Sequence, residues 1–134
     1  KRGLAMLQAV GPKLIAVYGE RSQTVGNYYF NVANADTALG RLEVARDGYL
    51  RAARTYELTG AAKTSYVGSA MWNAASMEMR LGNLDRAEEL CDEIERRWEG
   101  VVPPDAPVRE LFAKTRAELS ALIEVRDASS SRPS

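Results

Sequence analysis

Histidine is absent from this chain of 134 residues, and cysteine occurs once, as Cys91. Without histidine, nucleophiles of the Ser-His and Cys-His types and imidazole metal sites are excluded within the sequence. A single cysteine cannot form an intrachain disulfide, so we expect a reducing, cytoplasmic setting. Because 18 lysines and arginines balance 18 aspartates and glutamates, no net charge attracts nucleic acid or anionic lipid.

Long apolar runs and cofactor motifs are also missing. No stretch of roughly 18 apolar residues could span a bilayer, and no GxGxxG, GxxxxGK or EF-hand spacing occurs. Cys91 lies on an apolar helix face, and we interpret it as buried packing rather than as a nucleophile. We therefore predict that the protein is not an enzyme, requires no cofactor or metal, and binds neither nucleic acid nor membrane.

The chain does contain an internal repeat. Phe30-Asn31-Val32-Ala33 precedes Leu39-Gly40-Arg41-Leu42, and Trp72-Asn73-Ala74-Ala75 precedes Leu81-Gly82-Asn83-Leu84, with a step of 42 residues between Gly40 and Gly82. Apolar residues three or four apart predict helices on both sides of each glycine. The sequence therefore predicts an all-α fold of antiparallel helical hairpins, with about six helices stacked along the chain.

The pattern also sets the expected boundaries of one helical repeat domain over residues 1–126. We expect a single helix in 1–19, a repeat in 26–60, a second repeat in 64–100, and a terminal helix in 105–125. Within the repeats, helices are predicted over 27–39, 42–58, 65–81 and 85–98. The single helix lacks a first half, and Lys1 is not an initiator Met, so we expect the chain to be cut from a longer array.

Three local features refine these boundaries. Gly11 and Pro12 predict a kink or break in the first helix. The proline-rich segment 103–107 predicts a loop, after which Asp105 can cap the last helix. Residues 127–134 have little to pack, and we expect a disordered tail there.

The two hairpins resemble tetratricopeptide repeats (TPRs). That family places a small residue in the first helix, a glycine in the turn, an alanine early in the second helix, then an aromatic and another small residue. The first hairpin supplies Ala33, Gly40, Ala45, Tyr49 and Ala52, and the second supplies Ala75, Gly82, Ala87, Cys91 and Ile94, of which the last two depart from the pattern. The long step resembles the subgroup typified by kinesin light chains and many bacterial regulators. The resemblance implies a right-handed superhelix, that is, an α-solenoid.

The resemblance further implies that the first helix of each hairpin lines a concave groove. The uncharged residues expected there are Asn27, Phe30, Asn31, Asn34, Thr37, Ser69, Trp72, Asn73, Ser76 and Met79. In this family an asparagine at the place of Asn31 and Asn73 often clamps the backbone of an extended peptide, and Asn34 could do the same. Two alternatives stay open: the asparagines cap local backbone or face water, and Phe30 and Trp72 pack between hairpins.

Charge gives little further guidance about a ligand. Phe30 stands where family members that hold chaperone C-terminal tails have their first lysine, so that ligand class is not supported. Arg80, Lys114 and Arg116 are expected to be solvated and to give only a weak positive edge.

Two functions follow as expectations. The first is a protein–protein interaction module that binds a peptide or helix of a partner in its groove, within a larger scaffold or regulatory protein. The second is a structural spacer or self-association segment of a larger enzyme or regulator, without a ligand of its own. Apolar faces on the end helices, in residues 4–17 and 108–123, could support a homo-oligomer.

Overall fold

The structure is a computed structural model, and it describes residues 2–19, 22–59 and 65–130. These residues form helices and no strand, so the fold is all-α. The helices are α1 (Arg2–Tyr18), α2 (Gln23–Ala38), α3 (Leu42–Leu58), α4 (Ser65–Arg80), α5 (Leu84–Trp98) and α6 (Pro107–Ser130).

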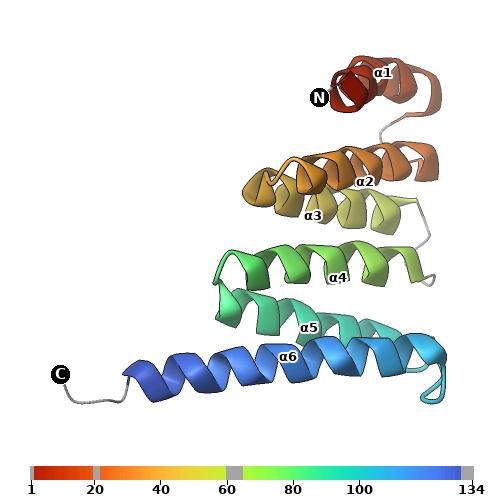
Figure 1. Ribbon diagram of the computed structural model, residues 1–134. Coiled ribbons are helices and arrows are strands. Elements are labelled where there is room, and N and C mark those ends of the chain that lie inside the picture. Colours follow the sequence, from red (N-terminus) through yellow and green to blue (C-terminus); the bar gives the residue numbers. More distant parts are fainter. Residues whose placement is uncertain (1, 20–21, 60–64, 131–134) are drawn as a thin grey trace.

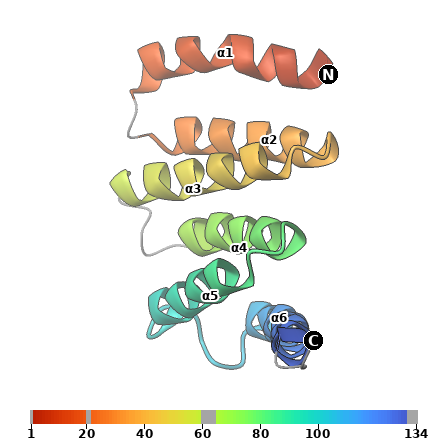
Figure 2. The ribbon, with the colours of Figure 1, turned by 90° about the vertical axis from the view of Figure 1, so that its left-hand side faces the viewer.

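The six helices lie in chain order, from α1 at one end of the molecule to α6 at the other (Figures 1 and 2). The main packing is between helices that follow each other in the sequence, most extensively α2 with α3 and α3 with α4. The core is correspondingly one continuous cluster that runs from α2 to α6. The alanines predicted at the helix crossings, Ala33, Ala45, Ala52, Ala75 and Ala87, are all fully buried.

The two predicted hairpin turns have the same geometry. Gly40 and Gly82 adopt φ values of +75° and +82°, in the left-handed region that favours glycine. In each turn the amide after the glycine donates back across it, from Arg41 N to Asp36 O at 2.9 Å and from Asn83 N to Glu78 O at 2.8 Å. This is the Schellman arrangement, which satisfies carbonyls at a helix end.

Each hairpin is closed by an aromatic side chain of its second helix, packed on a glycine of its first. Tyr56 of α3 packs on Gly26 of α2, and Trp98 of α5 packs on Gly68 of α4. A Cβ at Gly26 would lie 2.6 Å from Tyr56 Cε1, and one at Gly68 would lie 2.4 Å from Trp98 Nε1. The glycines therefore provide the space that these rings occupy.

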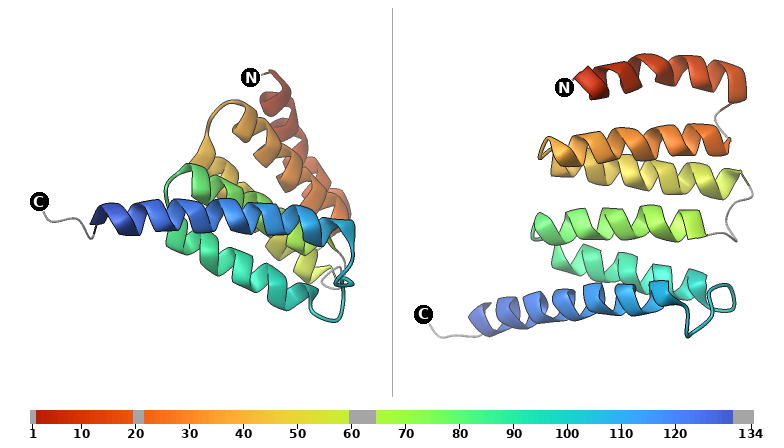
Figure 3. Two further views of the ribbon diagram at one scale, coloured as in Figure 1. Left: turned by 60° about the horizontal axis from the view of Figure 1, so that its bottom comes forward. Right: turned by 45° about the vertical axis from the view of Figure 1, so that its right-hand side comes forward.

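The last helix, α6, is the longest of the six and runs beside α5 (Figure 3). Phe112 of α6 is buried, and its ring centroid lies 5.3 Å from that of Trp72 and 5.1 Å from that of Trp98, both edge to face. This three-ring cluster joins α4, α5 and α6. Arg126 Nη1 adds an ion pair to Asp85 at 2.7 Å.

The helices differ from the predicted ones mainly in α1, at the start of α2 and at both ends of α6, and their other limits agree to within one residue. Helix α1 continues through Pro12 without a break, and α2 begins at Gln23, where Ser22 caps it by accepting from Val25 N at 3.1 Å. Helix α6 begins two residues after Asp105, the predicted cap. It continues through Ser130, past residue 127, where a disordered tail is expected. The rest of that tail, 131–134, and Gly60 lie outside the described residues.

Candidate functional site

Three asparagines form one face of α2. Asn27, Asn31 and Asn34 are spaced four and three residues apart, a spacing that places side chains on the same side of a helix. All three side chains are exposed. We call these three residues the asparagine face.

Two buried tyrosines of α3 bind two of these asparagines. The Tyr56 hydroxyl donates to Asn27 Oδ1 at 2.6 Å, and the Tyr49 hydroxyl donates to Asn34 Oδ1 at 2.6 Å. Both tyrosines are at most 3% exposed, so their hydroxyls need partners inside the protein. Because the oxygen of each amide is occupied, its NH₂ group is turned away from the tyrosine. The asparagine face therefore offers N–H donors at these two positions.

Asn31 and Asn73 occupy equivalent places in the two hairpins but have different surroundings. Asn31 makes no hydrogen bond to another residue in the part of the chain that the structure describes. Asn73 of α4 is half-buried, and its Nδ2 donates to Ser69 O, one turn earlier, at 2.9 Å. Asn73 thus caps local backbone with its donor, which is one of the alternatives that the sequence leaves open.

The two aromatic candidates make contacts within the chain. The ring centroid of Phe30 lies 5.3 Å from that of Tyr49, edge to face. Trp72 packs against Trp98 and Phe112, and its Nε1 donates to Thr115 Oγ1 at 3.1 Å. Both side chains are half-buried, so packing between helices accounts for most of their surface.

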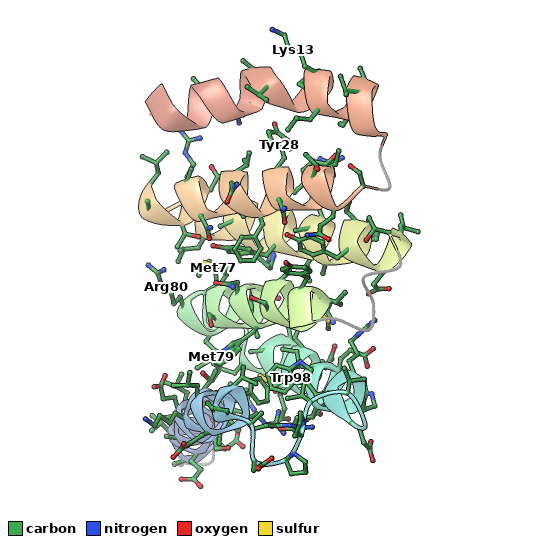
Figure 4. All side chains as sticks on the ribbon, turned by 90° about the vertical axis from the view of Figure 1, so that its right-hand side faces the viewer. Lys13, Tyr28, Met77, Met79, Arg80 and Trp98 are labelled. Atoms are coloured by element: carbon green, nitrogen blue, oxygen red, sulfur yellow. The ribbon has the colours of Figure 1, made fainter. Side chains whose placement is uncertain are left out.

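The remaining groove candidates vary in exposure. Ser69 is exposed and Ser76 is half-buried. Thr37 Oγ1 donates to Ala33 O at 2.9 Å and lies 3.7 Å from Met77 Sδ, a contact between α2 and α4. In Figure 4, Met77 lies on the side of α4 that faces α2 and α3, whereas Met79 points toward α6.

The charged and nucleophilic candidates have partners or lie in solvent. Arg80 and Lys114 are exposed. Arg116 pairs with Asp92 at 2.9 Å and with Glu95 at 3.2 Å. Cys91 is fully buried, and burial raises the pKa of its thiol, an effect that Arg116 partly offsets. The thiol is therefore protonated at neutral pH and unreactive.

The chain matches no protein-family model, and no curated protein matches it. None of the described helices is both long and apolar enough to cross a membrane. In the same described residues, no group of three or more acidic or cysteine side chains is placed to hold a metal ion.

Sequence reasoning found the three asparagines but missed the tyrosine bonds to them. Tyr49 stands out in the sequence only as a core aromatic, and Tyr56 does not stand out at all. The signal was present in the spacing, because Asn27 and Asn34 are seven residues apart, as are Tyr49 and Tyr56. In two antiparallel helices, that shared spacing lets Asn27 face Tyr56 while Asn34 faces Tyr49.

Proposed function

We propose that the chain is a TPR-like helical repeat that binds an extended peptide or a helix of a partner protein along α2 and α4. The repeated step of 42 residues supports this assignment, because it applies to the turn glycines and to the glycine–aromatic pairs alike. Right-handed superhelical stacking of the hairpins, as in an α-solenoid, is part of the proposal.

The asparagine face is the observation that carries the binding function. Asn27 and Asn31 are one helical turn apart, about 6 Å along the axis. Alternate residues of an extended chain are separated by roughly 6.8 Å, so successive carbonyls on one side of a peptide match these amides in spacing. With the Asn27 and Asn34 oxygens bound to tyrosines, the ligand would be held through its own carbonyl oxygens.

The alternative is a structural spacer or self-association segment, and one observation favours it. Phe30 and Trp72 are the side chains best suited to anchor a ligand, but Phe30 packs on Tyr49 and Trp72 packs on Phe112. A face without a free aromatic anchor has fewer means of binding tightly.

A comparison of captured partners distinguishes the two functions. We expect the wild-type protein to capture a partner that the Asn31→Ala, Asn73→Ala double variant loses at an unchanged melting temperature. These two positions are chosen because neither asparagine accepts a hydrogen bond from a buried tyrosine, as Asn27 and Asn34 do. Glu88→Ala on the exposed side of α5 is the matched control and should retain the partner. Equal capture by all three proteins, or capture by none, favours the structural segment.

A further inference from the structure

Asp36 and Glu78 are buried carboxylates at equivalent places in the two hairpins. They are 42 residues apart, and each lies four residues before the turn glycine. Asp36 is 2% exposed and Glu78 is 3% exposed. Because a buried charge is costly unless it is paired and hydrogen-bonded, both side chains call for a partner.

Glu78 has its partner. Its Oε1 accepts from Arg46 Nη1 at 3.0 Å and from Asn83 Nδ2 at 3.1 Å. Arg46 belongs to α3, so the guanidinium comes from the preceding hairpin and crosses to α4. One hairpin thus neutralises the buried acid of the next.

Asp36 lacks such a partner. Its Oδ1 is buried and accepts no hydrogen bond. The cation nearest to it among the described residues is Arg41, whose Nη1 lies 3.9 Å away, beyond hydrogen-bond distance, and whose side chain is half exposed. The residue of α1 that stands 41 or 42 positions before Arg46 is Ala5 or Leu4, and neither carries a charge.

Asp36 also lines a cavity of about 520 Å³ between α1, α2 and α3. Tyr28 and Tyr29 form part of its wall, and Figure 4 shows Tyr28 pointing from α2 toward α1. The second hairpin has a related cleft of about 550 Å³. Eight of the residues that line it stand 42 positions after residues that line the first cavity. Glu78 does not line that cleft, whereas Asp36 lines the first. Glu78 instead lines another cleft of about 620 Å³, together with Arg46. The two sites therefore differ in that Glu78 already binds a guanidinium, whereas Asp36 Oδ1 does not.

We propose that the cavity beside Asp36 receives an arginine side chain of a partner protein, whose guanidinium binds Asp36 as Arg46 binds Glu78. A planar guanidinium suits this site because it can hydrogen-bond a carboxylate with two N–H groups and stack on tyrosine rings. Arg51 already stacks in this way, with its guanidinium carbon 4.9 Å from the Tyr29 ring centroid.

The other charges that line the cavity do not cancel the attraction of Asp36. Arg51 and Arg54 also line it, but both are exposed, so water and salt weaken their repulsion. Asp47 adds a second acid at the rim, although it is paired with Arg46. The cavity lies on the side of α2 opposite the asparagine face, because Asp36 is about half a helical turn away from it. The two sites are therefore separable.

Titration with N-acetyl-L-arginine amide, followed by amide NMR shifts of the full chain, tests the site. The wild-type protein should show saturable shifts around Asp36 and Gly48. Asp36→Asn keeps the shape of the side chain but removes its charge, and should weaken binding roughly tenfold or more, as expected for loss of a hydrogen bond between charged groups. Glu78→Gln is the matched control and should bind the probe as the wild type does.

A second measurement needs no variant. The citrulline analogue of the probe replaces the guanidinium by a neutral group of the same shape. It should bind the wild-type protein at least roughly tenfold more weakly than the arginine probe does. The proposal is overturned if the shifts do not saturate, if Asp36→Asn binds like the wild type, or if the two probes bind equally. Asn31→Ala with Asn73→Ala should leave probe binding unchanged, so failure of the groove function would not be confused with failure of this site.

Discussion

At the scale of single residues, two glycines inside helices make room for large rings of the core. Gly26 and Gly68 do not adopt a positive φ, and their role is to leave space for Tyr56 and Trp98. A glycine within a helix ordinarily costs about 0.5–1 kcal/mol relative to alanine. Here the alanine methyl would meet a ring at 2.6 or 2.4 Å, so the usual preference is reversed.

Gly68→Ala should therefore destabilise the protein, by about 1–3 kcal/mol, as expected for overpacking a core. The urea midpoint of unfolding measures the effect. Ser69→Ala, next to it on the exposed side of α4, is the control and should leave the midpoint nearly unchanged. An unchanged or raised midpoint for Gly68→Ala would show that Trp98 can move away without cost.

The two buried acids give a second residue-scale prediction. Glu78→Gln weakens a bond to Arg46 and should lower the free energy of unfolding by about 1–3 kcal/mol. Asp36→Asn removes a charge that has no hydrogen-bonded partner on Oδ1, so it should change that free energy by less than about 0.5 kcal/mol or raise it. Chemical denaturation of both variants checks the difference. Equal losses at the two positions would mean that Arg41 stabilises Asp36 as Arg46 stabilises Glu78.

At the scale of elements, the two tyrosine–asparagine bonds tie α3 to α2, and the one made by Tyr56 makes the hairpin sensitive to alkali. Burial raises the pKa of Tyr56 above its ordinary value of 10.0, with a smaller contribution from Tyr66. The unfolded chain thus loses this proton at a lower pH than the folded one. The contribution of Tyr56 to the free energy of unfolding is therefore fully present below pH 10.0 and is lost as the pH rises through the raised pKa of the folded state.

Tyr56→Phe should therefore cost about 0.5–1.5 kcal/mol at neutral pH, from the lost hydrogen bond, and should flatten the alkaline decline. Urea unfolding at a series of pH values measures both effects. Tyr49→Phe removes the equivalent bond to Asn34 and serves as the comparison at neutral pH. If Tyr56→Phe lost stability in alkali as steeply as the wild type, other groups with a raised pKa, such as Tyr28 and Cys91, would account for the decline.

Phe112 and Leu119 are the buried apolar residues described on the last helix, and Phe112 is the one that joins the ring cluster. Its ring is buried between Trp72 and Trp98, whereas Leu111, Leu122 and Val125 on the same helix are exposed. Phe112→Ala should cost about 3–5 kcal/mol and detach α6 while the other hairpin contacts persist. Tryptophan fluorescence and hydrogen exchange in α6 measure this. Leu111→Ala is the neighbouring control, and equal effects of the two variants would contradict a role for the ring cluster.

The sequence predicts the existence of all six helices better than their ends, for physical reasons visible in α2 and α6. Apolar spacing depends on local periodicity, so it places the helix interiors well. The start of α2 depends on Ser22 as a cap, and α6 extends to Ser130, where Arg126 contacts Asp85 from another helix. The tyrosine bonds to the asparagine face likewise join residues far apart in the sequence, which a periodic pattern cannot pair.

At the scale of the whole molecule, each helix packs mainly on its neighbours in sequence, so stability should be graded along the stack. Packing is most extensive in the interior, at α3 and α4, and α4 contacts both α3 and α5 and contributes many buried side chains. Among the α1 residues whose surroundings the structure describes, only Gly11 is buried, against Tyr28. With these residues, helix α1, at the end of the stack, therefore buries little apolar surface against α2.

Amide hydrogen exchange should follow this gradient. The amides of α1 should exchange through local opening at a free energy well below that of global unfolding, whereas those of α4 should exchange only on global unfolding. An arginine bound beside Asp36 would contact α1, α2 and α3 together, so saturating N-acetyl-L-arginine amide should slow exchange in α1 and leave α4 unchanged. Equal protection of α1 and α4 without the probe would contradict a graded stack, since it would require the end helix to unfold together with the centre.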